Sequence, residues 1–292
     1  MITSSSNSRM KNIAKLQKSS KARKEQGVFV LEGIKMFGEA VEYSRVQEVY
    51  VSESFMALYG ELLEKGKNAV SPKENSLQAG ILSQMKRTGD DWLAAYNLEV
   101  VGDSVFHKLS ETVTPQGILA VVDMPEREFL EEGNILVLDG VQDPGNLGTI
   151  LRTAEAARIA GVLLSKDSAD VFNPKVIRAT MGGIFRVPFR IAENIVDETV
   201  SFKQTVDARG ENYRVYGAAL GEGCVEYTEP DYTKPSVIVI GNEAKGISPS
   251  MMNILDKRVQ IPMAGKVESL NAAVAASILM FEMARQNRLG GE

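Results

Sequence analysis

The chain has 292 residues, of which 44% are hydrophobic and 24% charged, as in a soluble globular protein of about two domains. One cysteine excludes an internal disulfide, and with a single histidine it leaves no Cys/His cluster for zinc, so we expect no metal. The start lacks the apolar core of a secretory signal, and the longest apolar run, 272–281, is about half the ~20 residues that span a bilayer. We therefore expect a cytoplasmic protein without a membrane partner.

The net charge of −5 is unevenly distributed. Residues 1–35 hold eight basic and two acidic side chains, so this segment carries +6 and the rest of the chain −11. The segment is either a solvated, partly frayed terminus or a basic strip for nucleic-acid phosphates, and composition does not decide between them. On the second interpretation, the candidate RNA contacts are Arg9, Lys11, Lys15, Arg23 and Lys24.

The first part of the chain predicts a small α/β domain. Residues 7–26 are polar and compatible with a helix, and apolar residues then recur at helical spacing from Leu31 to Val41. Strands are predicted at 27–33, 48–54 and 116–125. The charged, proline-bearing stretch 124–134 has few apolar anchors, so we predict a first domain over 1–125 and a linker over 126–134.

From Ile135 onward, short apolar strands alternate with helices. The strands are predicted at 135–139, 161–165, 213–220, 236–242 and 258–263. Asn173 before Pro174 and Ser248 before Pro249 are typical helix starts. This alternation predicts a second, larger α/β domain over 135–292, with a largely parallel sheet and helices on both faces.

Three loops at strand ends are rich in Gly, Asn or Ser, namely 139–152, 241–248 and 261–273. In parallel α/β sheets, ligands bind beyond the carboxyl ends of the strands. Gly241 and Gly246 have the spacing of a phosphate loop, but Ile247 stands where such a loop needs Lys, which disfavours an ATP or GTP site. A strand followed by G-x-G-x-x-G is also missing, which disfavours a nicotinamide site.

The last loop leads into an apolar helix. Ser269 is a plausible N-cap, and Leu270, Val274, Ile278 and Phe281 form one stripe of a helix that is apolar almost all round. Such a helix is either buried within one domain or packed partly against a second copy of the chain, and we favour the second interpretation.

Taken in this order and spacing, the three loops resemble the signature motifs of the SpoU (TrmH-like) family of RNA 2′-O-ribose methyltransferases, within the SPOUT superfamily. The resemblance covers residues 135–287. A weaker one, carried by "ITSSSNSRMKNIAKL", "FVLEG" and "TPQGILAVV", is to that family's substrate-binding domain, which has a fold like a small RNA-binding ribosomal protein.

The resemblance implies an α/β trefoil-knot domain that binds S-adenosylmethionine and forms a homodimer through the helices of the knot. It implies RNA as the partner, with ribosomal RNA the leading substrate and transfer RNA second. The family's cofactor-contacting positions fall on Gly241, Ile261 and Leu270, with Met263 beside them. Its catalytic-site positions fall on Asn146, Arg152, Glu243, Ser269 and Asn271.

Arg152 follows Gly148 by four residues, so both are predicted on one face of a helix whose first turn offers free N–H groups. We expect this turn to hold an RNA phosphate, with Arg152 as its clamp. A guanidinium stays protonated in proteins, so we assign Arg152 phosphate positioning and stabilisation of the developing alkoxide rather than proton abstraction. Glu243 could instead only hold its loop in place, and Ser269 could be only a helix cap.

Four further residues are expected to be structural. His107 is predicted at the surface, Cys224 in a loop, and Trp92 and Tyr96 in the core rather than stacked on bases. Two other functions remain open, a non-catalytic RNA-binding assembly factor with the same fold and an unrelated nucleotide-binding α/β enzyme.

Overall fold

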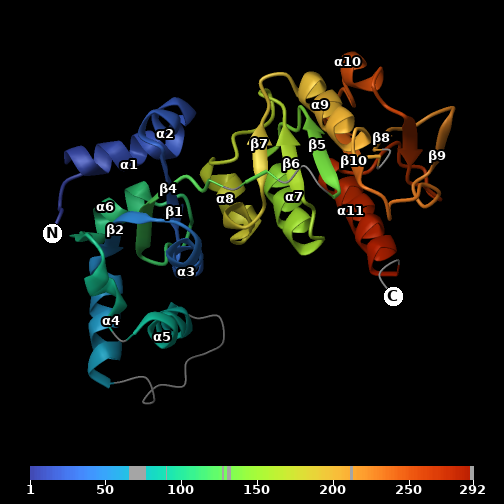
Figure 1. Ribbon diagram of the computed structural model, residues 1–292. Helices are drawn as coiled ribbons and strands as arrows, with labels where there is room; N and C mark the ends of the chain where they lie inside the picture. The colour runs from blue at the N-terminus through green and yellow to red at the C-terminus, as the bar shows by residue number, and fades with distance from the viewer. Residues whose placement is uncertain (66–76, 90, 127, 130–132, 211–212, 290–292) are drawn as a thin grey trace. The chain divides into compact units, whose positions relative to one another are not determined.

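The computed structural model describes residues 1–292 except 66–76, 90, 127, 130–132, 211–212 and 290–292 (Figure 1). The described residues form two compact units. Unit 1 comprises residues 1–125 and 172–185, and unit 2 comprises residues 126–171 and 186–292. The first division thus follows Pro125, and part of the expected linker lies outside the described residues. The sequence pattern did not predict that residues 172–185 belong to unit 1.

Unit 1 contains a four-stranded sheet of order β1-β4-β2-β3, in which β4 is antiparallel to both neighbours and β2 is parallel to β3. Its elements are α1 (Ser8–Lys18), α2 (Ser20–Gln26), β1 (Val28–Glu32), α3 (Ile34–Tyr43), β2 (Val46–Ser52), α4 (Glu53–Lys65), α5 (Leu77–Thr88), the 3₁₀ helix η1 (Trp92–Ala95), β3 (Leu98–Val101), α6 (Asp103–Leu109), β4 (Ile118–Asp123), α8 (Pro174–Thr180) and the 3₁₀ helix η2 (Gly183–Phe185). The three strands predicted in this part of the chain are confirmed as β1, β2 and β4.

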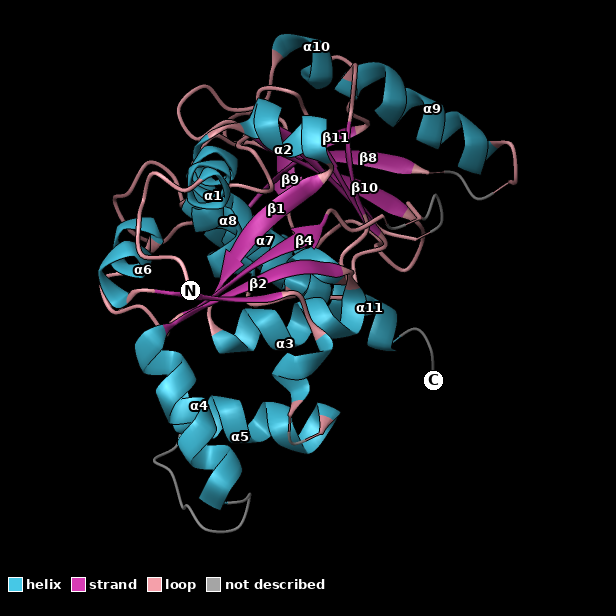
Figure 2. Cartoon of the chain, turned by 90° about the vertical axis from the view of Figure 1, so that its left-hand side faces the viewer, coloured by secondary structure: helices cyan, strands magenta, loops and turns pink. Residues whose placement is uncertain are grey.

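Helices cover both faces of this sheet. On one face, Met10, Ile13 and Leu16 of α1 pack with Val28 and Val30 of β1, and α6 adds to the same core. On the other face lie α3, α4 and α5, and Figure 2 shows α1 and α3 on opposite sides of β1, β4 and β2. Because successive residues of a strand face opposite sides, every second residue of β1 serves each core.

Residues 172–185 pack around the edge strand β1. The ring centroids of Phe172 and Phe185 lie 5.1 and 5.9 Å from that of Phe29, on the α3 side of the sheet. Helix α8, capped by Asn173, packs against β1, and η2 packs against α3. An edge strand exposes unpaired backbone groups unless something covers it, and here a segment from much later in the chain does so.

Unit 2 contains a seven-stranded sheet of order β7-β6-β5-β10-β8-β11-β9, and all its paired neighbours are parallel, as predicted. Its elements are β5 (Ile135–Asp139), α7 (Pro144–Ala156), β6 (Gly161–Leu164), β7 (Phe189–Ile191), α9 (Ile195–Asp207), β8 (Arg214–Ala218), β9 (Cys224–Glu226), β10 (Ser236–Gly241), α10 (Pro249–Met252), β11 (Lys257–Gln260) and α11 (Ala272–Leu289). Strands β7 and β9 were not predicted.

Helices also cover both faces of this second sheet. Phe202 and Val206 of α9, with Met251 of α10, pack against Val137 and Val239 on one face. Helices α7 and α11 pack against each other, and α11 also contacts β10 (Figure 1). Among the described residues, no helix is long and apolar enough to cross a membrane.

Candidate active site

The three polar loops meet at one edge of the unit 2 sheet. Strands β5 and β10 are parallel neighbours, with Asp139 beside Gly241 at their carboxyl ends. The loops that follow these strands therefore leave the sheet side by side. The third loop follows β11 and ends at Asn271, the residue before α11.

The loop after β10 closes tightly on itself. Asn242 and Gly246 exchange two backbone hydrogen bonds of 2.9 Å each, and Gly246 has a φ of +70°. A Cβ on Gly241 would lie 2.2 Å from the carbonyl carbon of Gly246 and 2.3 Å from the nitrogen of Ile247, which real Cβ atoms do not tolerate. Gly241 is therefore needed for the close approach of two backbone segments.

A chain of side-chain hydrogen bonds joins the three loops. Asn146 donates from Nδ2 to Oε1 of Glu243 over 2.9 Å, and Asn271 donates from Nδ2 to Oδ1 of Asn146 over 2.9 Å. We call this set the Glu243–Asn146–Asn271 chain. Because a carboxylate only accepts, both amides are fixed in orientation, with each nitrogen toward the preceding acceptor.

Glu243 also binds the backbone of the first loop. Its two carboxylate oxygens accept hydrogen bonds of 3.1 Å from the N–H groups of Gln142 and Asp143. Burial raises the pKa of this carboxyl, but hydrogen bonds from Asn146 and from these backbone groups outweigh it and hold the pKa below its usual value. Glu243 is therefore a stable anion that ties two loops together.

This arrangement corrects the expectation that the first loop holds an RNA phosphate on its N–H groups. Two of those groups bind Glu243, and the N–H of Asn146 binds the side chain of Asp143, the N-cap of α7, over 2.8 Å. Protein carboxylates thus satisfy the donors at the start of this helix, for which an external anion would have to compete.

A cavity of about 550 Å³ opens between the loop after β10 and the start of α11. It is lined by the four predicted cofactor-contacting residues and by three of the predicted catalytic residues, Gly241, Ile261, Met263, Leu270, Glu243, Ser269 and Asn271. Its volume lies within the range of ~300–1,000 Å³ that is usual for small-molecule sites. Ala218, the last residue of β8, and Leu220, just beyond that strand, also line it and were not predicted.

Arg152 does not line this cavity in the single chain. It lies on the exposed side of α7, whereas Gly148, one turn earlier, is buried, so the two residues do not form one exposed face. Asn146, at the start of the same helix, reaches the cavity's rim through its bonds to Glu243 and Asn271. Among the described residues, Arg152 makes no hydrogen bond or ion pair with another side chain.

The expectation that Ser269 caps the last helix is wrong. The side-chain oxygen of Asn271 accepts hydrogen bonds from Ala273 and Val274, and its carbonyl accepts the first helical bond from Ala275. Asn271 is therefore the N-cap of α11, and the helix begins two residues later than Ser269 predicted.

Two more polar residues hold the loops and were missed from the sequence. Asp139, which is 8% exposed, accepts a 2.7 Å hydrogen bond from the N–H of Ser248. Asn242 donates to the carbonyl of Gly140 over 2.8 Å and accepts from two N–H groups of its own loop. Asp139 is the last residue of β5 and Asn242 directly follows β10. A polar residue at the end of a buried apolar strand is a sequence signal from which both could have been predicted.

The predicted basic strip is only partly available for binding. Arg23 is 3% exposed and donates to the backbone carbonyls of Leu16 and Gln17, so the expectation that it contacts RNA is corrected to a structural role between α1 and α2. Arg9 pairs with Glu99 over 2.5 Å. The lysines of the set, Lys11, Lys15 and Lys24, are exposed.

The remaining residues expected to be structural lie mostly as predicted. Trp92 is buried against Phe37 and Tyr59, Tyr96 meets the edge of Phe37, and His107 is exposed on α6. Cys224, expected in a loop, instead begins the edge strand β9 and is half-buried.

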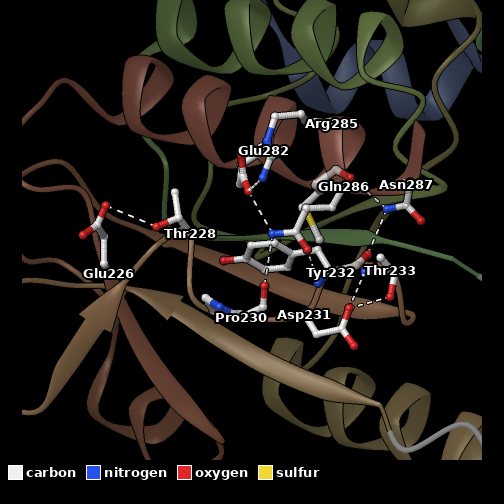
Figure 3. Close-up of polar contacts among 11 residues, drawn as sticks. Glu226, Thr228, Pro230, Asp231, Tyr232, Thr233, Glu282, Arg285, Gln286 and Asn287 are labelled. Atoms are coloured by element: carbon white, nitrogen blue, oxygen red, sulfur yellow. Dashed lines mark hydrogen bonds and ion pairs between the residues drawn. The ribbon is translucent and has the colours of Figure 1, made fainter. Parts of the chain in front are cut away.

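A polar clasp holds the C-terminal half of α11, away from the cavity (Figure 3). Gln286 accepts from the N–H of Tyr232 over 2.9 Å and donates to the carbonyl of Pro230 over 3.1 Å. Asn287 donates to the carbonyl of Tyr232 over 2.9 Å. These hydrogen bonds fix α11 to the segment that leads into β10. Helix α11 and the loop after β10 are the two main walls of the cavity, so the clasp helps to hold both walls in position.

Comparison of the sequence with known proteins identifies the family to which this site belongs. The SpoU rRNA Methylase family matches residues 133–281, and the MRM3-like substrate binding domain matches residues 7–120. The chain is 31% identical to the 23S rRNA (guanosine(2553)-2′-O)-methyltransferase RlmP of Bacillus subtilis, over 97% of this chain and 98% of that protein.

The chain belongs to the SpoU rRNA methylase family.

Other members agree in sequence and in fold. The human mitochondrial rRNA methyltransferase 3 is 31% identical, over 84% of this chain and 72% of that protein. The crystal structure of the SpoU methyltransferase AviRb from Streptomyces viridochromogenes, in complex with AdoMet, has a TM-score of 0.78 to this structure. The two chains are 25% identical, over 98% of this chain and 100% of AviRb. As a SpoU methylase the protein is a methyltransferase, and S-adenosylmethionine is its methyl donor.

Proposed function

We propose that this SpoU methylase methylates the 2′-hydroxyl of a ribose in 23S ribosomal RNA. The observation that carries the proposal is one cavity lined by the loops after β10 and β11, to which the Glu243–Asn146–Asn271 chain ties the first family loop. Two relatives with this activity support the choice of RNA: RlmP matches nearly the whole chain, and a Streptomyces viridochromogenes relative that matches 61% of it is named a 23S rRNA (uridine(2479)-2′-O)-methyltransferase.

The cavity has the properties that S-adenosylmethionine requires. Ile261, Met263 and Leu270 offer apolar walls for an adenine ring, and the glycine at 241 lets the loop after β10 fold back on itself to form part of the facing wall. When bound, the cofactor supplies an electrophilic methyl group on a positively charged sulfur. The protein's part is to hold the acceptor hydroxyl in line with that methyl, and such alignment can lower a barrier by ~7–11 kcal/mol.

We assign the Glu243–Asn146–Asn271 chain to the positioning of the reacting ribose. Its amide groups lie at the cavity rim in fixed orientations, and the exposed hydroxyl of Ser269 lines the same rim. Glu243 keeps its charge through its hydrogen bonds, so its role is to hold Asn146 and the first loop rather than to carry a proton.

Arg152 completes this site from a second copy of the chain in our proposal. Its guanidinium is exposed on α7 and does not line the cavity of its own chain. Since it stays protonated, it binds the phosphate beside the target ribose and stabilises the developing alkoxide.

The outer face of α11 supports such a homodimer. Val274 and Phe281 are each 47% exposed, although both belong to the stripe that the sequence marked as apolar. We propose that this stripe packs against its equivalent in a second chain, and that the last segment of unit 2 is threaded into the trefoil knot of the family. Because the relative that matches nearly the whole chain is a bacterial 23S rRNA methyltransferase, we propose that the enzyme acts in the cytoplasm.

Mapping of ribose methylation tests the proposal. We expect that deletion of the gene removes one 2′-O-methyl mark from 23S ribosomal RNA, and that purified enzyme with S-adenosylmethionine restores it. Calorimetry with S-adenosylmethionine separates the competing functions, because a non-catalytic assembly factor would leave all marks in place and need not bind the cofactor. Loss of a 2′-O-methyl mark from transfer RNA instead would show that transfer RNA is the substrate. Unchanged marks in both RNAs would reject the proposal.

A further inference from the structure

We infer that α8 extends the lysine stripe of α1 into one surface on unit 1 that binds the phosphate backbone of RNA. The surface, here called the α1–α8 surface, consists of Lys11, Lys15, Lys18, Lys175 and Arg178. The inference rests on the proposed function, since it takes the substrate to be RNA. It assigns part of the RNA contact to α8, which lies in the sequence between β6 and β7 of the unit 2 sheet.

The three lysines of α1 lie on one side of that helix. Lys11, Lys15 and Lys18 are spaced i, i+4 and i+7, which places them in a row over ~10 Å of helix. All three are exposed, and none forms an ion pair with another described residue. The opposite side of α1 is apolar and buried, so the helix is anchored with its charges outward.

Helix α8 repeats this arrangement. Val176, Ile177 and Thr180 are buried against unit 1, whereas Lys175 is exposed and Arg178 half-buried. The whole segment 172–185 contains these two cations and no carboxylate. Neither cation has an ion-pair partner among the described residues, so both charges are available to an external anion.

The two helices approach each other beside β1. Gln17 of α1 and Arg178 of α8 border one hollow, together with Val30 of β1. Figure 2 shows α1 and α8 on the same side of β1. Gln17 is buried and is followed directly by Lys18, the last lysine of the row. The hollow holds about 10 Å³, room for at most one water and none for a base, so the contact is with the RNA backbone rather than a flipped base.

Two carboxylates at this hollow do not cancel the positive charge. Glu32 accepts hydrogen bonds from the hydroxyls of Ser110 and Thr112 and from the N–H of Glu111, which are neutral donors and leave its charge in place. Glu111 itself is exposed and lines the same hollow. Against these two carboxylates stand the five cations of the surface.

The opposite layer of unit 1 has little net charge. Helices α3, α4 and α5 carry five carboxylates and four cations. The carboxylates are Glu39, Glu42, Glu53, Glu61 and Glu64, and the cations are Lys35, Lys65, Lys86 and Arg87. A polyanion is therefore drawn to the α1–α8 side of the sheet and finds no comparable attraction on the other side.

A matched pair of variants of the full-length protein tests the inference. The test variant is Lys175→Gln with Arg178→Gln, and the control is Lys35→Gln with Lys86→Gln, two exposed lysines of α3 and α5 in the same unit. Binding is measured to unmodified 23S ribosomal RNA transcribed in vitro, between about 50 and 300 mM KCl. S-adenosylmethionine binding is measured by calorimetry, and the thermal midpoint checks the fold.

We expect the test variant to bind this RNA roughly tenfold to thirtyfold more weakly near physiological salt, and its salt slope to fall by about 2. Cofactor affinity and methyl transfer at saturating RNA stay at the wild-type level, and the control variant keeps wild-type RNA affinity. Equal RNA affinity of test and control variants would overturn the inference. Failure of the wild-type protein to bind or methylate this RNA would instead overturn the proposed function.

Discussion

The carboxylate of Glu243 determines how the side-chain amides of Asn146 and Asn271 are oriented. Its carboxylate can only accept, so Asn146 turns its nitrogen toward it and leaves its oxygen for Asn271. Asn271 then turns its own oxygen to the start of α11. One anion thus fixes the direction of the hydrogen bonds in the Glu243–Asn146–Asn271 chain, and its protonation would loosen them.

The first prediction concerns pH. The pKa of Glu243 is lowered in the folded protein, so its contribution to the loops is fully present above the unfolded pKa and is lost as pH falls through the folded pKa. We expect S-adenosylmethionine affinity to be constant around neutral pH and to fall only when the pH drops below the ordinary pKa of a glutamate. Glu243→Gln should bind more weakly at neutral pH, with no such acid limb. An unchanged acid limb in the variant, measured by calorimetry, would assign the effect to another group.

The second prediction concerns the close approach at Gly241. An added Cβ would collide with the backbone of Gly246 and Ile247, which have no free end that can move aside. We expect Gly241→Ala to lower S-adenosylmethionine affinity by at least tenfold. Gly265→Ala is the control, because nothing lies within 4 Å of its Cβ position and the residue is in the neighbouring loop. Equal affinities of the two variants would show that the loop after β10 can yield.

The third prediction concerns the guanidinium. Arg152→Lys keeps the charge but loses the planar fork that holds a phosphate and an alkoxide together. We expect kcat to fall by ~10²–10³ with cofactor affinity unchanged. Arg158→Lys, an exposed arginine just beyond the same helix, should retain full activity. Near-normal turnover by Arg152→Lys would refute its assignment.

At the scale of elements, α11 takes part in the candidate active site with its N-terminal end and is anchored to the rest of unit 2 by its C-terminal half. Its N-cap belongs to the Glu243–Asn146–Asn271 chain, and its C-terminal half is held by Gln286 and Asn287. Between these ends, the hydroxyl of Ser277 lies 3.3 Å from that of Thr153 on α7. The helix is therefore restrained along its length, which keeps the cavity wall in place.

The fourth prediction separates the two candidate caps of this helix. Asn271→Ala removes the acceptor of two helix N–H groups and should lower the free energy of unfolding by about 1 kcal/mol. Ser269→Ala should change it by less than about 0.5 kcal/mol, because Ser269 is exposed and caps nothing. Chemical denaturation of both variants measures the difference. A larger loss from Ser269→Ala would restore it as the cap.

Sequence patterns predicted elements better than they predicted partners. Strands β5, β6 and β10 are buried apolar runs, so composition alone locates them. The cap of α11 could not be predicted, because Ser269 and Asn271 are both good caps and a tertiary hydrogen bond that Asn271 donates to Asn146 favours the second. Arg23 counted as a surface cation for a similar reason, since charge in a sequence does not reveal that a guanidinium is buried under two carbonyls.

At the scale of the whole molecule, the fifth prediction concerns assembly. If the exposed stripe of α11 is the homodimer face, Val274→Asp with Phe281→Asp places two carboxylates in an apolar interface. We expect this variant to sediment as a monomer and to lose activity, whereas Val113→Asp, at a residue 93% exposed on unit 1, stays dimeric and active. A dimeric double variant would exclude α11 as the contact.

The division of the chain has a less obvious cause. The site residues of unit 2 could be located from loops that follow strands, but the return of residues 172–185 to unit 1 could not. That segment lies between β6 and β7, which pair in the other sheet, and its apolar residues suit either unit. The segment belongs to unit 1 because the rings of Phe172 and Phe185 pack against that of Phe29, more than a hundred residues earlier in the chain.

This late closure of β1 has a consequence for biosynthesis. A ribosome that has made the first 125 residues has produced every strand of the unit 1 sheet, yet Phe29 still lacks its two aromatic neighbours. The missing cover is translated only after β5, α7 and β6 have been made. The proposed RNA-binding surface of unit 1 is thus completed only after part of the methylase sheet has been synthesised.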